Sequence, residues 1–175
     1  MAFRFKRRES IAVGFARLVA EQIEAAVEAL EKSPNGGVHE ARKCIKRFRA
    51  LLRLFRRALP DGTFDQENDV LRAVARHLSS VRDAQVRIAV FDSLVKGLKT
   101  PGIATARRHL CSAFEAAAMR GGQPGPPWRA TITALRAVGA RLPGLKPDSG
   151  WSVLGRGLKA TYRRARRAHA AARAD

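Results

Sequence analysis

Apolar residues recur every three to four positions over most of the chain, a pattern that predicts amphipathic helices. In the first such stretch, residues 10–32, the apolar positions are Ile11, Phe15, Leu18, Ile23, Val27 and Leu30. The same spacing predicts further helices over residues 38–59, 63–96, 100–120, 128–142 and 150–174. No stretch alternates β-branched and polar residues between hairpin turns. We therefore expect an all-α protein, a bundle of about six amphipathic helices.

Turn-forming residues separate these segments. The breaks are SPNGG at residues 33–37, PDG at 60–62 and the linker GGQPGPP at 121–127. We expect one helical domain spanning 1–175, with a candidate sub-boundary at the linker 121–127. The long third segment leaves room for a bend near Ser79 and Ser80. We expect a capping box of Thr63 with Gln66 at the start of the third helix. Thr100 is the expected N-cap of the fourth helix, with Pro101 as its first residue, and Asp148 or Ser149 is the expected N-cap of the last helix.

The balance of charge favours a polyanionic partner. The chain has 34 Lys and Arg residues against 15 Asp and Glu residues, a formal net charge of +19 and a pI near 11.6. This excess is far above what solubility requires of a small domain. The partners that fit are nucleic acid, an anionic membrane surface and inorganic polyphosphate.

The cysteines and the apolar runs indicate the cellular compartment in which the protein is expected. Cys44 and Cys111 have no C-x-x-C spacing and lie among apolar residues, so we expect two reduced core thiols in a cytoplasmic protein. The basic N-terminus leads into an amphipathic helix that contains Arg17, which disfavours a signal peptide. No apolar run is long enough to cross a bilayer, and we expect no membrane insertion.

Residues 38–59 carry the most concentrated charge. On a helical wheel, Ala41, Cys44, Phe48, Leu52, Phe55 and Leu59 gather on one side and the basic residues on the other. The basic face consists of His39, Arg42, Lys43, Lys46, Arg49, Arg53 and Arg57. Like charges at i+3 or i+4 repel one another, and the segment offers few acids to relieve that repulsion. We infer that a polyanion relieves it, since the forked donors of arginine suit phosphate oxygens.

The last predicted helix has a similar arrangement. Its basic face includes Arg156, Lys159, Arg163 and Arg166, and the opposite face, Leu154, Leu158, Tyr162, Ala165 and Ala168, is expected to pack on the core. If the two basic faces point toward each other, they form a positively charged groove. If they point apart, they form only a positively charged surface.

His39 has two readings. It can be a structural residue near the start of a helix, or it can donate to phosphate when protonated. The zinc motif H-E-x-x-H is not met, because Lys43 stands where the second histidine would be. His77, His109 and His169 form no metal-ligand spacing with it or with one another. We expect no metal and no cofactor.

Three stretches resemble the CHAD family, the conserved histidine α-helical domains. The first has Val38-His39, Arg42 and Lys43, then Lys46 and Arg47, and ends in Arg49-Ala50-Leu51-Leu52-Arg53-Leu54-Phe55. The second, LSSVRDAQV at residues 78–86, is similar to the family's L-G-x-x-R-D-x-x-V stretch. The closing GLKATYRRARRAHA, residues 157–170, resembles the helix that leads into the second half of such domains.

The resemblance implies two related helical bundles around a basic groove that binds inorganic polyphosphate, sometimes on polyphosphate granules. By position it implies that His39, Arg42, Lys43, Lys46, Arg49 and Arg53 line the groove. Arg82 matches the second marker, and Asp83 is expected to pair with a basic residue and orient it.

One departure concerns the second half. Such domains carry another H-x-x-R-K-like helix there, and this chain ends at Asp175 before that point. Two alternatives remain: the chain is a shortened piece, or a homodimer completes the groove. No E-x-E-x-K signature of a CYTH-type triphosphatase is present, so that activity is not expected.

Four functions are weighed against the sequence. The first is non-catalytic binding of polyphosphate, and the alternative is a DNA- or RNA-binding helical module. The basic faces lack interleaved aromatic residues for base stacking, and no helix-turn-helix is evident. A metal-dependent phosphohydrolase using His39, Glu40 and Asp83 is disfavoured, because no carboxylates or histidines cluster at ligand spacing. A membrane-surface role is disfavoured too, because the apolar faces are needed for the core.

Overall fold

The computed structural model describes residues 3–33, 36–119, 128–141 and 151–173. Across these residues the chain forms helices and no strand, which confirms the all-α prediction. The helices are α1 (Ile11–Lys32), α2 (Val38–Phe55), α3 (Thr63–Leu94), α4 (Ile103–Met119), α5 (Arg129–Arg141) and α6 (Trp151–Ala171). In this part of the chain no helix combines the length and the apolar content needed to cross a membrane.

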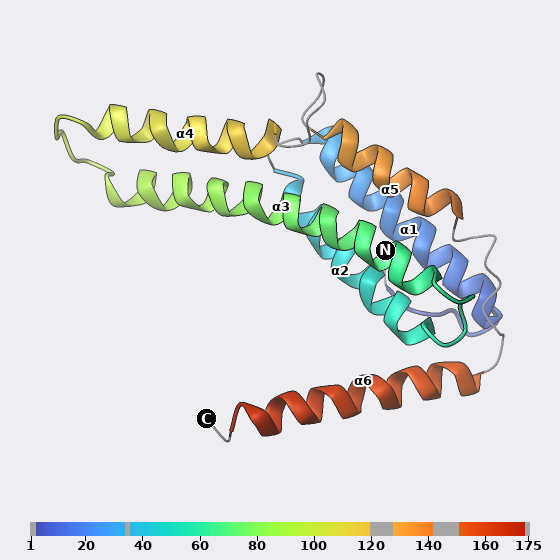
Figure 1. Cartoon of the computed structure of the whole chain (residues 1–175). Helices are drawn as coiled ribbons and strands as arrows, with labels where there is room; N and C mark the ends of the chain where they lie inside the picture. Colours follow the sequence, from blue (N-terminus) through green and yellow to red (C-terminus); the bar gives the residue numbers. More distant parts are fainter. Residues whose placement is uncertain (1–2, 34–35, 120–127, 142–150, 174–175) are drawn as a thin grey trace.

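The core lies where α1, α2, α5 and the first half of α3 meet (Figure 1). All six apolar positions predicted in α1 are buried, and so are the six predicted for residues 38–59. Phe15 of α1 contacts Phe55 of α2, with ring centroids 4.6 Å apart. The periodic apolar residues therefore pack these two helices together, which leaves the basic side of α2 outside the core.

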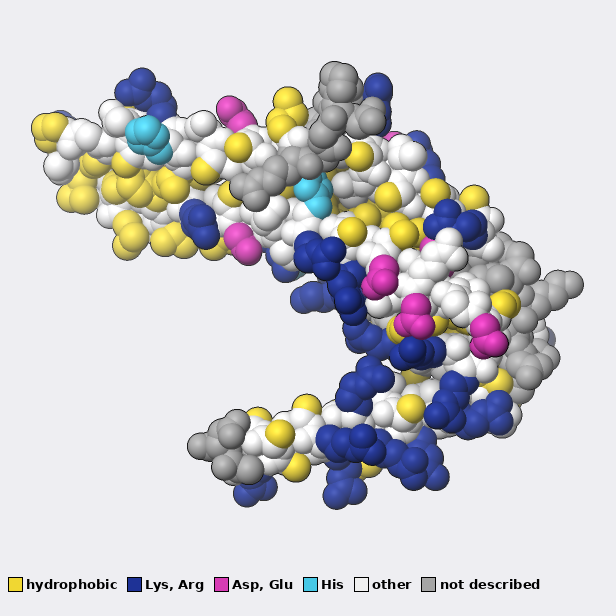
Figure 2. Space-filling model, in the orientation of Figure 1, with side chains coloured by type: hydrophobic (Ala, Val, Ile, Leu, Met, Phe, Trp, Pro, Cys, Tyr) yellow, Lys and Arg dark blue, Asp and Glu magenta, His cyan; other side chains and the backbone are white. Residues whose placement is uncertain are grey.

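Beyond this core, α4 and the outer half of α3 extend together as a two-helix arm (Figure 1). α6 lies apart from this arm, on the other side of the core. The ribbon of α3 changes direction near its middle, where the hydroxyls of Ser79 and Ser80 donate to the backbone carbonyls of Ala75 and His77. Such hydroxyl bonds to the preceding turn often bend helices, in line with the expected bend. Figure 2 shows the open hollow that the arm and α6 enclose, with Lys and Arg side chains along its inner margin.

Several local predictions are wrong. α3 begins at Thr63 as predicted, but the expected capping box is absent: the N-cap is Gly62, which has φ of 77° and makes no side-chain bond. This left-handed φ suits only glycine, so the turn sets the start of the helix. Pro101 lies in a turn, and α4 begins two residues later at Ile103. Cys44 is buried as expected, but Cys111 is only partly buried. The linker 121–127 and the predicted caps Asp148 and Ser149 lie outside the described residues.

α6 packs differently from the prediction. Its expected core face is largely solvent-exposed: Leu158 is 62% and Tyr162 is 61% exposed. The buried residues of α6 are Val153 and Gly157. A Cβ atom at Gly157 would lie 2.0 Å from the carbonyl oxygen of Leu54. The contact with α2 therefore requires a glycine, a feature that a count of large apolar residues does not register.

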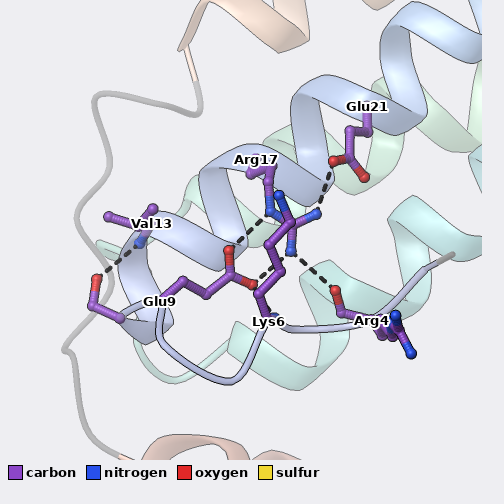
Figure 3. Close-up of polar contacts among 7 residues, drawn as sticks. Arg4, Lys6, Glu9, Val13, Arg17 and Glu21 are labelled. Atoms are coloured by element: carbon purple, nitrogen blue, oxygen red, sulfur yellow. Dashed lines mark hydrogen bonds and ion pairs between the residues drawn. The ribbon is translucent and has the colours of Figure 1, made fainter. Parts of the chain in front are cut away.

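The segment before α1 is held by one arginine (Figure 3). The Arg17 guanidinium donates to both carboxylate oxygens of Glu9, at 2.9 and 2.5 Å, to Glu21 Oε1 at 2.8 Å and to the carbonyl of Arg4 at 2.9 Å. Phe5 of the same segment lies 6.3 Å from Phe55, centroid to centroid. The segment thus packs against both α1 and α2.

This cluster predicts a pH-dependent stability. The hydrogen bonds from Arg17 lower the pKa of Glu9 from 4.5 to about 2. Because the pKa is lower in the folded state, the interaction stabilises the fold fully above pH 4.5 and is lost as the pH falls toward 2. We expect Glu9→Gln to reduce the free energy of unfolding at neutral pH, and the difference from wild type to vanish on acidification. Urea unfolding of both proteins across this range measures it; a difference that does not change with pH would contradict the prediction.

α5 is fixed to the core through a charged pair and an aromatic contact. Arg141 donates to both carboxylate oxygens of Glu67, at 2.6 and 2.8 Å, and only 2% of the Glu67 side chain is exposed. Trp128, just before α5, meets the ring of His77 edge-on at 5.5 Å. His77 is therefore part of the packing between α3 and α5.

Candidate functional site

The outer face of α2 is basic along its whole length. His39, Lys43, Lys46 and Arg53 are exposed on α2, and Arg57 is exposed just beyond its end, whereas Arg42 and Arg49 are half-buried. This exposure follows from the burial of the opposite face in the core. The predicted division of α2 into an apolar and a basic side is therefore present in the structure.

A pocket of about 480 Å³ lies between α2 and α3, and we call it the α2–α3 pocket. The first wall comes from α2 and the second from α3. The lining residues are Arg42, Lys46, Arg49, Arg72, Ala75, Arg76, Ser79, Ser80 and Asp83. Five cations thus surround the pocket and only one carboxylate, Asp83, joins them in the lining. Such an excess of positive charge between two helices attracts anions.

Arg49 lines this pocket and is half-buried. Its Nε donates to Asn68 Oδ1 at 3.1 Å, and Asn68 is buried. Partial burial and the positive charges of Arg53 and Arg72 lower the pKa of Arg49. The charged form of Arg49 is thus disfavoured by its surroundings, and a bound anion would stabilise it.

Few acids neutralise these cations within the molecule. Lys43 pairs with Glu40 at 3.1 Å, Arg56 with Asp65 at 3.2 Å, and Arg72 with Asp69 at 3.8 Å. All three pairs are largely exposed, and such pairs are weak. Within the described part of the chain Arg42, Lys46 and Arg76 have no ion pair. Asp83 is exposed and, among those same residues, makes neither an ion pair nor a hydrogen bond, so its expected role of orienting a basic residue is not seen.

A second pocket, also about 480 Å³, lies between the end of α2 and α6, and we call it the α2–α6 pocket. It forms because Gly157 brings α6 against Leu54. Its lining residues are Arg53, Leu54, Arg56, Arg57, Asp61, Phe64, Gly157, Ala160, Thr161 and Arg164. The guanidinium of Arg56 covers the ring of Phe64 at 4.4 Å from its centroid. Cations of α2 and α6 therefore share one pocket.

The structure brings together only part of the predicted set. Arg42, Lys46 and Arg49 meet in the α2–α3 pocket, and Arg53 and Arg57 meet in the α2–α6 pocket. On α6, the cation in the pocket is Arg164, whereas the predicted Arg156, Lys159, Arg163 and Arg166 are exposed outside it. His39, Lys43 and Arg82 also lie outside both linings. Anion binding by any of these residues remains a prediction.

Sequence reasoning singled out Asp83 but missed Arg72 and Arg76 on the wall that α3 provides. Arg72, Arg76, Ser79 and Asp83 are spaced by four, three and four residues, and Ser80 follows Ser79, so they lie on one face of the helix. That signal was present in the sequence. It was hidden by the mixed charge of α3, whose acids Asp65, Glu67 and Asp69 precede this face.

The described residues contain no metal-binding cluster. In them, no group of three or more His, Cys, Asp or Glu side chains is placed to hold a metal ion. His39, Glu40 and Asp83, the residues weighed for a phosphohydrolase, therefore form no metal centre in this part of the chain.

A comparison with models of protein families identifies the family of this chain. The model of the CHAD domain matches residues 15–175, which is most of the chain. The chain belongs to the CHAD family. No curated protein and no solved structure matches it. CHAD domains are associated in general with polyphosphate binding and are not known as catalysts.

The first two of the stretches that resemble the CHAD family meet at one place in this CHAD domain. Arg42, Lys46 and Arg49 come from the first stretch, and Ser79, Ser80 and Asp83 come from the second. These stretches are distant in sequence, but α2 and α3 pack side by side, so both contribute to the α2–α3 pocket.

Proposed function

We propose that this CHAD domain binds inorganic polyphosphate without catalysis, and that the α2–α3 pocket is the principal site. The observation that carries the proposal is the convergence of five cations on one pocket whose lining contains one carboxylate. Polyphosphate has a negative charge on every unit and no apolar part. It therefore complements a pocket whose specificity comes almost wholly from charge and hydrogen-bond donors.

The binding mechanism is charge-assisted hydrogen bonding. Arginine forks donate to two phosphate oxygens at once, and lysine acts as a point charge. Each phosphate that the protein neutralises releases condensed counterions, so the affinity falls steeply with salt. Ser79 and Ser80 line the same wall, but their hydroxyl protons are engaged by backbone carbonyls, so we assign the binding to the cations.

The basic face of α2 joins the two pockets into a path for a polymer. Arg42, Lys46 and Arg49 lie at the first pocket, and Arg53 and Arg57 lie at the second. The span from Arg42 to Arg57 is about 22 Å at the rise of an α-helix. A chain long enough to reach both pockets gains from the second contact without a second loss of translational freedom. We therefore assign this domain a preference for long-chain over short-chain polyphosphate.

A nucleic acid is the alternative partner, because it is also a phosphate polymer. Single-stranded nucleic acids are held largely by stacking of bases on aromatic rings. The lining of the α2–α3 pocket contains no aromatic residue, and the only ring in the lining of the α2–α6 pocket, Phe64, is covered by Arg56. The pockets thus favour a ligand without bases.

Competition between the two polymers tests the proposal. Fluorescent long-chain polyphosphate is bound to the pure protein and titrated with duplex DNA, single-stranded RNA or unlabelled polyphosphate at equal phosphate concentrations. We expect unlabelled polyphosphate to displace the probe at a concentration roughly tenfold or more below either nucleic acid. Displacement by DNA or RNA at the same or a lower phosphate concentration would contradict the proposal and favour the alternative.

The cellular setting follows from the ligand. A binding protein of this kind is expected in the cytoplasm and on polyphosphate granules. A fluorescent fusion that stays diffuse in cells whose granules are stained would contradict the granule assignment.

A further inference from the structure

The two-helix arm carries a row of exposed apolar side chains. The row consists of Val86, Val90, Leu94 and Leu98, each four residues after the last, and we call it the arm stripe. The exposed fraction is 40% at Val86, 51% at Val90 and 73% at Leu94, and it is 59% at Leu98 in the turn that follows. Single exposed apolar residues are common on protein surfaces, but a contiguous row is typical of an interaction surface.

The arm stripe stays open because of the way the arm packs. α4 packs against α3 along the arm, and the apolar residues Ile88, Phe91 and Val95 of this region are half-buried. Ile88 lies roughly 160° around the helix from Val90, so the stripe is on a different side of α3. Figure 2 shows hydrophobic side chains along the arm and at its end. The arm therefore has one apolar side that α4 covers and another that faces solvent.

The stripe ends at the tip of the arm, in the turn between α3 and α4. The backbone N–H of Leu98 donates to the carbonyl oxygen of Val95 at 3.0 Å, which closes the turn directly after α3. The two most exposed residues near this turn are Leu94 and Leu98. The described helices all lie on the core side of the turn (Figure 1), so a flat surface can reach the tip.

The tip is also cationic. Lys96 and Lys99 are exposed between and beside the two leucines, and neither forms an ion pair with a described residue. No acid occurs from residue 93 to residue 114. Asp92, the carboxylate that precedes this range, is engaged by Arg107 at 2.8 Å. The apolar side chains at the tip are therefore flanked by positive charges that are available to an anion.

Leucine beside lysine at a projecting turn fits the surface of an anionic membrane. Apolar side chains enter the headgroup boundary of a bilayer, and the ammonium groups of neighbouring lysines reach the lipid phosphates. Each Lys or Arg near an anionic surface raises the affinity by roughly fivefold. A second copy of this chain fits less well, because two molecules with a net charge of +19 repel each other. An acidic helix also fits less well, because a projecting turn offers it no groove.

The reason given against a membrane-surface role in the sequence does not hold for the arm. That reason is that the apolar faces are needed for the core. The arm stripe is an apolar face outside the core, which lies where α1, α2, α5 and the first half of α3 meet. A contact with a membrane surface therefore costs the core nothing.

We propose that the tip of the two-helix arm docks on anionic lipid bilayers, with Leu94 and Leu98 at the headgroup boundary and Lys96 and Lys99 on the lipid phosphates. This docking does not involve polyphosphate. It is measured without any phosphate polymer, so its failure leaves the proposed ligand untouched. A protein that fails to bind polyphosphate can still dock through the tip.

Sedimentation with vesicles tests the docking. Wild-type protein is mixed with vesicles of equal parts phosphatidylcholine and phosphatidylglycerol, or with vesicles of phosphatidylcholine alone. We expect binding to the anionic vesicles to be tighter by roughly tenfold or more. Leu94→Ser/Leu98→Ser should weaken that binding by roughly tenfold or more. Lys96→Gln/Lys99→Gln should weaken it by roughly tenfold. All four residues are exposed, so the variants should keep the fold.

Matched controls make the same kinds of change away from the arm. Leu158→Ser/Tyr162→Ser removes two similarly exposed apolar side chains from α6. Lys6→Gln/Lys159→Gln removes two exposed lysines outside the arm. We expect each control to weaken binding to anionic vesicles by roughly threefold or less, because salt screens distant charges.

A tryptophan at the tip reports the contact directly. Leu98→Trp should bind anionic vesicles at least as tightly as wild type, because tryptophan favours the membrane interface. The fluorescence that it adds over wild type should be quenched by bromine-labelled lipid chains.

Equal binding of wild-type protein to neutral and anionic vesicles would overturn the proposal. So would equal losses in the tip variants and the controls, or a tip tryptophan that the labelled lipid does not quench. A leucine variant that binds vesicles like wild type and loses self-association in the ultracentrifuge would overturn it too, and would assign the tip to a contact between copies.

Discussion

Lys46→Glu combined with Arg76→Glu is expected to reduce the affinity for long-chain polyphosphate by roughly a hundredfold, or about 3 kcal/mol. The two residues stand on opposite walls of the α2–α3 pocket, Lys46 on α2 and Arg76 on α3. Neither has an ion pair among the described residues, so both are available to phosphate. The double change removes two charge-assisted contacts and adds two repulsive carboxylates. Isothermal titration of each protein with the same polyphosphate preparation measures the loss.

The matched control for this prediction is Arg108→Glu with Arg129→Glu. Both residues are exposed and lie on α4 and α5, outside the two basic pockets. The control lowers the net charge by the same amount, but screening by salt limits the effect of distant charges. We expect a loss of roughly threefold or less in the control. Equal losses in the two variants would mean that net charge, and not the pocket, determines binding.

Gly157→Ala is expected to destabilise the protein by about 2 kcal/mol and to displace α6 from α2. The added Cβ would lie 2.0 Å from the carbonyl oxygen of Leu54, and a backbone atom cannot move aside as a flexible side chain can. Arg164 would leave the α2–α6 pocket with the helix. We therefore expect weaker binding of long-chain polyphosphate and little change for chains that fill only the α2–α3 pocket.

Gly155 supplies a control on the same helix. A Cβ there would meet nothing within 4 Å, and the residue is exposed. Replacing an exposed helical glycine with alanine stabilises a helix by up to about 1 kcal/mol. The two substitutions should thus change the free energy of unfolding in opposite directions. Thermal unfolding and hydrogen exchange of α6 measure both effects; stabilisation by Gly157→Ala would contradict the close packing of α6 on α2.

The periodicity of apolar residues was sufficient to predict the core helices. Phe15 and Leu18 of α1, and Phe48 and Leu52 of α2, are buried where a period of 3.6 residues places them. These helices lie between the core and solvent, so their two sides differ sharply in polarity. The basic side of α2 follows from the same pattern, which is why most of the predicted cations on this helix line a pocket.

The parts that were not predicted depend on contacts between elements. α6 packs through Gly157, and its larger apolar residues Leu158 and Tyr162 remain exposed. A helical wheel ranks faces by hydrophobicity and cannot register a contact that depends on the absence of a side chain. Arg72 and Arg76 were missed for a related reason: their place in the site depends on how α3 packs against α2. The start of α3 at Thr63 was predicted but its cap was not, because the turn is set by the φ of 77° at Gly62 and not by a side chain.

A crystal structure of the protein with a short polyphosphate, of a length that fills one pocket, tests the central claim most directly. We expect phosphate groups between α2 and α3, within hydrogen-bonding distance of Arg42, Lys46 and Arg76. Phosphates bound only on the outer side of α6 or on the α3–α4 arm, with the α2–α3 pocket empty, would contradict the account.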